Sequence, residues 1–145
     1  MANNWVYNVL TLNGSDVAIK NVLNHIKGDG AIDFNKVIEI PSYLTDDNEL
    51  DGNEGWTKSV KCVQKWCQKN WGTKWIARGA CMDGNRRICF ETIDDIPSGV
   101  MQHMSEKFTQ VQIELDSDYG NGNIVHNIWK KGNKVEIMQN SEISS

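Results

Sequence analysis

The apolar residues of this chain switch between two spacings, and the order of the switches limits the fold more than any other feature. Residues 5–12 alternate with both faces largely apolar, which is typical of a strand in the middle of a sheet. After Asn13-Gly14, Ser15 is a good N-cap for a helix. That helix has an apolar stripe at helical spacing, formed by Ile19, Val22, Leu23 and Ile26.

The same two spacings predict the elements further along the chain. Helical spacing recurs over residues 56–71, which Gly72 ends, and again after Pro97, a residue suited to the first turn of a helix. Strand spacing recurs in five further segments: 75–82, 86–92, 111–118, 124–130 and 134–138. Two other segments fit no long element. Residues 31–40 are a short strand or an extended packed segment, and residues 45–55 form an exposed acidic loop.

This order predicts an α+β fold. The elements follow the split β-α-β pattern of ferredoxin-like sandwiches: a strand, a helix, two strands, a helix and a strand. An insert with its own helix follows the first helix, and a β-hairpin follows the last strand. We expect one domain over residues 1–140, with the insert at about residues 29–72 and the C-terminal hairpin at about residues 124–138. Residues 141–145 are expected to be a frayed tail.

Composition and charge exclude few classes of protein, but they indicate the cellular compartment. The net charge of −4 provides no overall attraction to nucleic acid, and no segment has the length and hydropathy of a signal peptide or a membrane span. The four cysteines form no C-x-x-C pair and fit no zinc pattern, so we expect small core residues, no metal site and no cofactor. Together these features predict a cytoplasmic protein.

The segment from Trp66 to Trp75, "WCQKNWGTKW", holds three of the six tryptophans. Trp66 and Trp71 are five residues apart, about 140° around a helix, so we expect one ring in the core and the other at its margin. Beside them lie an amide, a hydroxyl and a cation that are able to hold a nucleotide. The candidate ligand-binding residues here are Asn70, Trp71, Thr73, Lys74 and Trp75. In the alternative interpretation, Asn70 and Thr73 bond to backbone groups at the helix end and Lys74 is solvated.

Basic residues supply two further candidates. Arg86 and Arg87 are able to hold phosphate, with Arg78 across the hairpin, although adjacent strand residues point to opposite faces. Phe90 is the only aromatic residue of that strand, which weakens the case for RNA binding on the sheet. A row of lysines, Lys58, Lys61, Lys65 and Lys69, follows one face of the second helix. It is either a nucleic-acid surface or an ordinary solvated face.

Three segments resemble one protein family. "WCQKNWGTKW", the N-terminal "WVYNVLTLNG" and "DFNKVIEIP" are similar to motifs of the YubB-like ferredoxin-fold family, and the similarity extends from about Trp5 to Asp116. Members of that family occur on phages, prophages and plasmids. The resemblance implies a ferredoxin-like fold and a mobile-element origin, hence the host cytoplasm for a phage-encoded chain. It implies no reaction.

We therefore expect a non-enzymatic accessory binding protein of a phage or mobile element. Such a protein would counter host defence by sequestering a small signalling nucleotide or by blocking a host defence protein. The alternative is a nucleic-acid-binding accessory protein that uses the lysine row. An enzyme is the least favoured class, because no catalytic motif links His25, His103 and His126. A homo-oligomer is compatible with the sequence, with Lys130, Lys131 and Lys134 protecting the exposed edge of the hairpin.

Overall fold

The computed structural model describes residues 4–44, 53–120 and 122–139, and within these it leaves the side chains of residues 53–61 and 136–139 undescribed. The predicted frayed tail and most of the predicted acidic loop therefore lie outside the described residues. The helices are α1 (Asp16–Ile26), α2 (Phe34–Val37), the 3₁₀ turn η1 (Ser42–Leu44), α3 (Asn53–Asn70) and α4 (Ser98–Lys107). The strands are β1 (Trp5–Asn13), β2 (Arg78–Met82), β3 (Arg87–Ile93), β4 (Gln112–Asp118), β5 (Ile124–Lys130) and β6 (Asn133–Gln139).

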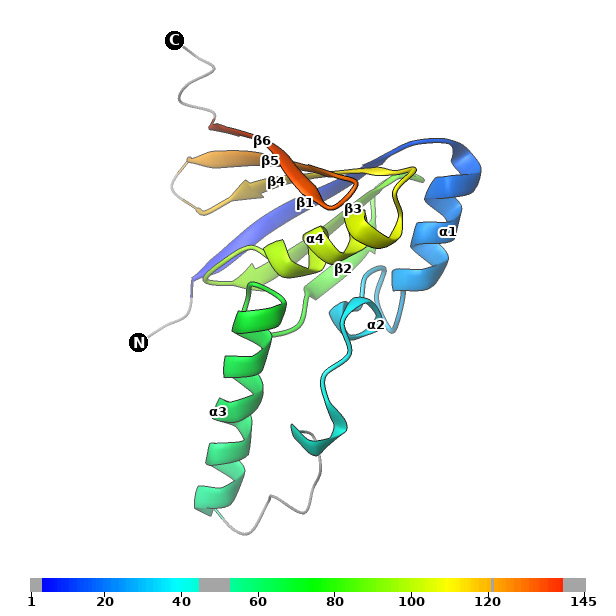
Figure 1. Cartoon of the computed structure of the whole chain (residues 1–145). Coiled ribbons are helices and arrows are strands. Elements are labelled where there is room, and N and C mark those ends of the chain that lie inside the picture. The colour runs from blue at the N-terminus through cyan, green and yellow to red at the C-terminus, as the bar shows by residue number, and fades with distance from the viewer. Residues whose placement is uncertain (1–3, 45–52, 121, 140–145) are drawn as a thin grey trace.

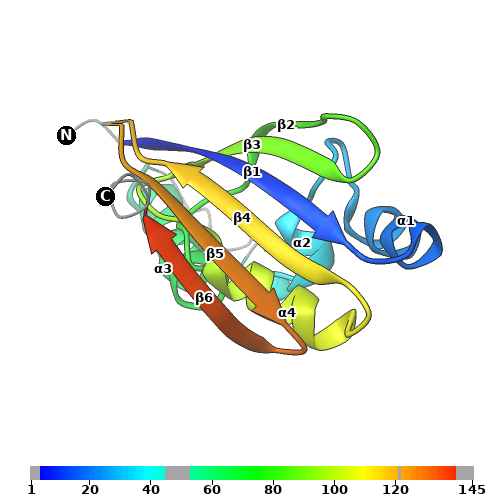
Figure 2. The same cartoon turned by 90° about the horizontal axis from the view of Figure 1, so that it is seen from above.

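The strands form one six-stranded antiparallel sheet in the order β2-β3-β1-β4-β5-β6. β1 pairs with β3 on one side and with β4 on the other, so the predicted central position of the first strand is confirmed. The helices all lie on one side of the sheet, as Figure 1 shows from the side and Figure 2 from above. Of the elements that the structure describes, no helix covers the opposite side, which we call the open face.

The core forms where the alternating side chains of the strands meet the helices. Val6, Leu10 and Leu12 of β1 are almost fully buried on the side of the sheet that the helices cover. α1 begins as predicted, because the side chain of Ser15 accepts a hydrogen bond from the backbone N–H of Ala18 and satisfies a free donor of the first turn. Removal of apolar surface from water is the main stabilising term in such a layer.

A polar network crosses this apolar core. The amide of Asn8 donates to the Thr92 hydroxyl at 3.0 Å and accepts from the Ser117 hydroxyl at 2.8 Å. Thr92 in turn donates to the backbone carbonyl of Asp95. All three side chains are buried, and they join β3, β1 and β4. Because buried polar groups are costly unless bonded, the network favours this strand order over others.

Several local predictions are wrong. Residues 31–40 contain the single helical turn α2, which Asp33 caps by accepting from the backbone N–H of Asn35. The strand expected at 75–82 begins only at Arg78, since the preceding residues are used to leave α3. The four cysteines are not all core residues, because only Cys67 is buried while Cys62 and Cys81 are exposed.

Candidate functional site

Trp71 anchors the corner between α3 and the sheet. Its ring is fully buried, and its Nε1–H donates to the backbone carbonyl of Ile38 at 2.9 Å. The ring meets Phe34 and Trp66 edge to face, with centroids 5.5 and 5.8 Å away. Trp66 is half-buried, so the prediction of one core ring and one marginal ring is confirmed. Trp75, beyond the turn, is also half-buried.

The polar residues of this segment bond to the protein itself. Asn70 donates from its amide to the Trp66 carbonyl at 2.9 Å, and Thr73 donates to the Ile93 carbonyl at 2.8 Å. Asn70 thus makes the helix-end contact that the alternative interpretation predicts, whereas Thr73 bonds to the end of β3 and not to the helix. Because Thr73 and Trp71 are both buried, neither side chain lines a surface where a ligand could bind.

Lys74 lies at the surface and forms an ion pair with Asp94, with 3.1 Å between Nζ and Oδ2. Asp94 has a left-handed backbone with φ 64°, a conformation that Asn also tolerates. A hydrogen bond from the backbone N–H of Asn4, and after it the bond from Lys74, lowers the pKa of Asp94 below its usual value. The folded state therefore holds the ionised form more tightly than the unfolded chain does.

Replacing Asp94 by Asn should test this contact. A lowered pKa stabilises the fold above the unfolded pKa of about 3.9 and stops doing so as the pH falls through the folded pKa. Since both side chains are partly exposed, we expect Asp94→Asn to lower the free energy of unfolding by at most about 1 kcal/mol near neutral pH. Urea titrations at several pH values should show the gap between variant and wild type closing in acid. A gap that is constant with pH would contradict the assignment.

The structure separates the three arginines that the sequence grouped. Arg86 turns toward the helices and donates to Asp16 of α1 at 3.2 Å. Arg87 pairs with Asp83, 3.6 Å away. Arg78 pairs with Glu91, and its guanidinium lies 3.4 Å from the ring centroid of Trp5. Arg86 therefore belongs to a different surface from Arg78 and Trp5.

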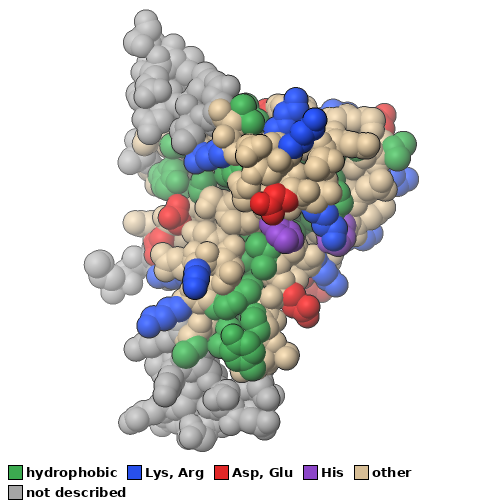
Figure 3. All heavy atoms as spheres, viewed as in Figure 1, with side chains coloured by type: hydrophobic (Ala, Val, Ile, Leu, Met, Phe, Trp, Pro, Cys, Tyr) green, Lys and Arg blue, Asp and Glu red, His purple; other side chains and the backbone are tan. Residues whose placement is uncertain are grey.

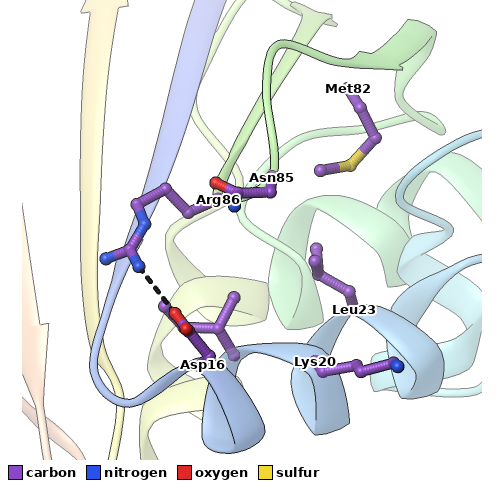
Figure 4. A pocket seen from close by; sticks show the side chains of 7 residues that line it. Asp16, Lys20, Leu23, Met82, Asn85 and Arg86 are labelled. Atoms are coloured by element: carbon purple, nitrogen blue, oxygen red, sulfur yellow. Dashed lines mark hydrogen bonds and ion pairs between the residues drawn. The ribbon is translucent and has the colours of Figure 1, made fainter.

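A cavity of about 390 Å³ lies between α1 and the β2–β3 hairpin, at the side chain of Arg86 (Figure 4). Its wall combines apolar side chains with two cations, one carboxylate and one amide. The lining residues are Asp16, Ile19, Lys20, Leu23, Met82, Asn85 and Arg86. Its volume is within the range usual for small-ligand pockets, about 300–1,000 Å³. Of the ligand-binding residues predicted from the sequence, only Arg86 lines it.

The open face has a cluster that sequence reasoning missed. His126 of β5 bonds through Nδ1 to Asp116 of β4, and its Nε2 lies 3.9 Å from Glu114. Two carboxylates in alternate positions of one strand share a face, and this spacing can be read from the sequence. The sequence does not show which strand lies opposite them. With Asp118, these side chains make the β4 part of the open face acidic. Such a surface repels phosphate.

The aromatic residues also differ from expectation. Phe90 is buried on the helix side and contacts Phe34 with 5.8 Å between centroids. The open face instead has Trp5 and Tyr7 on the central strand, with Tyr7 47% exposed. The aromatic side chains on this face therefore belong to β1 and not to β3.

The lysine row lies in α3, which spans Asn53–Asn70. Lys65 and Lys69 are exposed, whereas the side chains of Lys58 and Lys61 lie outside the described residues. Hydrophobic side chains also gather over η1 beside α3, where Tyr43 is exposed (Figure 3). That strip borders residues 45–52, which the structure does not describe.

The described residues contain neither a metal-binding cluster nor a membrane-spanning helix. There, no group of three or more His, Cys, Asp or Glu side chains could hold a metal ion. In the same part of the chain, no helix combines the length and the hydropathy needed to cross a membrane.

Comparisons with known proteins show one structural likeness. No protein-family model matches the chain, and no curated protein matches it. The crystal structure of the protein api92 from Yersinia pseudotuberculosis, of the family DUF1281, is similar with a TM-score of 0.56 at 11% sequence identity. The likeness covers 95% of this chain and 98% of that one. At this identity it shows a shared fold and nothing about activity.

Proposed function

We propose that this protein is a non-enzymatic binding protein that holds a small anionic ligand, a nucleotide, in the cavity between α1 and the β2–β3 hairpin. One observation carries the proposal: cations stand beside an apolar wall in a cavity of ligand size. Ile19, Leu23 and Met82 form the apolar part, able to contact a base or sugar, and Arg86 offers its guanidinium to a phosphate. Lys20 adds a positive charge to the wall, although its side chain extends away from Arg86 (Figure 4).

The charge around the cavity supports an anionic ligand. Arg86 and Lys20 outnumber the single carboxylate of Asp16, although the chain as a whole has a net charge of −4. Arg86 gives one N–H to Asp16, and a guanidinium has five such donors. Asp16 is 92% exposed, so a bound phosphate can compete for Arg86 at little cost to the protein.

The fold and the biological role complete the proposal. β3 lies between β1 and β2, and the order β2-β3-β1-β4 supports a ferredoxin-like sheet that β5 and β6 extend. Together with the YubB-like motifs, this supports an accessory protein of a phage or mobile element, working in the host cytoplasm. By retaining a signalling nucleotide, such a protein would counter host defence without catalysing a reaction.

Replacing Arg86 by Gln tests the site, and Arg87→Gln is a matched control one residue away on the other side of the sheet. Calorimetry with nucleoside monophosphates, cyclic dinucleotides and inorganic phosphate should find a nucleotide that binds the wild type. A charge-assisted hydrogen bond contributes about 1.5–3 kcal/mol, so we expect at least about a tenfold weaker Kd for Arg86→Gln. The Kd of Arg87→Gln should stay within about twofold of the wild-type value.

Two results would contradict the proposal. One is the absence of binding by any of these probes, and the other is an equal loss in the two arginine variants. A DNA oligonucleotide is the counter-probe, since Lys65 and Lys69 are exposed as the nucleic-acid alternative requires. Binding that falls steeply with salt and disappears in a Lys65→Ala, Lys69→Ala variant would favour that alternative.

A further inference from the structure

Two cysteines face each other on the open face of the sheet. Cys81 of β2 and Cys89 of β3 are direct partners in the antiparallel register. Opposed residues of neighbouring strands point to the same face, and none of the described helices lies over that face (Figure 2). Cys81 is exposed and Cys89 is half-buried, both as free thiols. The pair is therefore reachable by a small reagent from solvent.

The backbone spacing suits a bond between the two sulfurs. The Asp83 N–H donates to the Arg87 carbonyl two positions along the hairpin, which makes Cys81 and Cys89 a hydrogen-bonded type of pair. The Cα atoms of such a pair lie about 5.5 Å apart, within the span of about 4.4–6.8 Å that disulfides occupy. The distance between the Cβ atoms of such a pair is slightly longer than disulfides prefer, so one strand must move toward the other.

β2 is the strand able to make that movement. It is the edge strand of the sheet, and its register with β3 shifts between Arg78 and Cys81. Within the shift, Gly79 has φ 64° and nothing within 4 Å of where a Cβ would lie. An edge strand with a bulge and an unobstructed glycine adjusts more easily than a strand paired on both sides.

The surroundings mark this pair out from the other cysteines. Tyr7 of β1 lies against it, and a side-chain hydrogen bond with Cys89 raises the pKa of Tyr7. On α3, burial raises the pKa of the Cys67 thiol to about 11, which suppresses its reactive thiolate. Cys62 is exposed on the same helix and serves as an internal reference for an accessible thiol without this arrangement.

We propose that Cys81 and Cys89 form a reversible dithiol site that low-molecular-weight disulfides oxidise to a cross-strand disulfide. The Cys81 thiolate attacks one sulfur of glutathione disulfide and releases one glutathione. The Cys89 thiolate then attacks the Cys81 sulfur of the mixed disulfide and releases the second. The two electrons from the protein thiols reduce the glutathione disulfide, and the two thiol protons end on the two glutathione molecules.

Intact-mass spectrometry and peptide mapping of the folded protein test this site without relying on a variant. In excess glutathione disulfide, the pair should lose two hydrogen atoms, and mapping should join Cys81 to Cys89, while any glutathione on exposed Cys62 is counted separately. Dithiothreitol should reverse the change. Cys62→Ser removes the exposed thiol on α3 that glutathione and a second molecule can also reach, and it should form the same disulfide between Cys81 and Cys89. Cys81→Ser and Cys89→Ser should retain one glutathione on the remaining cysteine of the pair.

Three outcomes would overturn the proposal. In the first, Cys81 and Cys89 of one molecule each carry a separate glutathione, which means that the sulfurs cannot reach one another. In the second, both thiols stay reduced while Cys62 is modified. In the third, the disulfide forms only in urea, which means that the folded register does not bring the pair together. None of these results depends on ligand binding at the cavity, so the test of the dithiol site is independent of the test of the proposed function.

Discussion

Replacing Trp71 by Ala should lower the free energy of unfolding by about 3–5 kcal/mol, the range found for large buried aromatic residues. The ring is fully buried, contacts Phe34 and Trp66, and donates a hydrogen bond to the Ile38 carbonyl. Its removal leaves a cavity and an unpaired carbonyl at the corner between α3 and the sheet. Urea denaturation followed by far-ultraviolet circular dichroism gives the value without depending on tryptophan fluorescence.

Two further variants identify the cause of that loss. Trp71→Phe keeps most of the ring but removes the N–H donor, so it should cost less than Trp71→Ala. Trp75→Ala removes a half-buried ring from the same segment and should also cost less. If Trp75→Ala destabilised the protein as much as Trp71→Ala, the anchor of the corner would be the segment as a whole and not the buried ring.

Replacing Gly99 by Ala should lower the free energy of unfolding by about 2–3 kcal/mol, although Ala is the better helix former by about 1 kcal/mol. A Cβ at Gly99 would lie 2.1 Å from the backbone oxygen of Asn70 and 2.9 Å from its carbonyl carbon. There the first turn of α4 packs on the end of α3, and Gly99 N–H donates to the Trp71 carbonyl at 2.9 Å. Thermal and urea unfolding measure the change.

Gly120→Ala is the matched control. Gly120 has φ 92°, and a Cβ there would meet nothing within 4 Å, so the substitution adds backbone strain without a clash. We expect a loss of about 1 kcal/mol. A stabilised Gly99→Ala variant would mean that the two helix ends are further apart than the structure places them.

Patterns local in sequence predicted much of this fold. The alternation in residues 5–12 identified the central strand, because a strand buried among neighbours needs apolar residues on both faces. Gly72 was expected to end α3, and its φ of 96° is the left-handed conformation that this role requires. The C-terminal hairpin appears as β5 and β6 within a residue of the expected bounds.

Features that depend on contacts between residues far apart in sequence could not be predicted. Gly99 reads as a poor helix residue until α3 is packed against it, and Asn8 reads as an interruption of an apolar strand until Thr92 and Ser117 are opposite. Pro97 was expected in the first turn of α4, and it lies at the N-cap position. The helix begins with no side-chain cap, because its first N–H groups bond to the Trp71 carbonyl.

The same limit applies to the candidate site. Residues 70–75 resemble a ligand-binding segment because an amide, a hydroxyl, a cation and two rings are adjacent in sequence. In the structure, the turn after α3 buries Trp71 and Thr73. Arg86 was singled out for its charge, but its partners in the cavity come from α1, about seventy residues earlier. Proximity in sequence was therefore a poor guide to which side chains share a surface.

The position of β1 between β3 and β4 has a consequence for synthesis on the ribosome. β1 emerges first, but its two partners begin only at Arg87 and Gln112. Until translation has passed both, a strand that is apolar on its buried side has unpaired backbone on both edges. Nascent chains of this protein should therefore depend on early chaperone contact, and the final closure of the sheet should be slow compared with the formation of its hairpins.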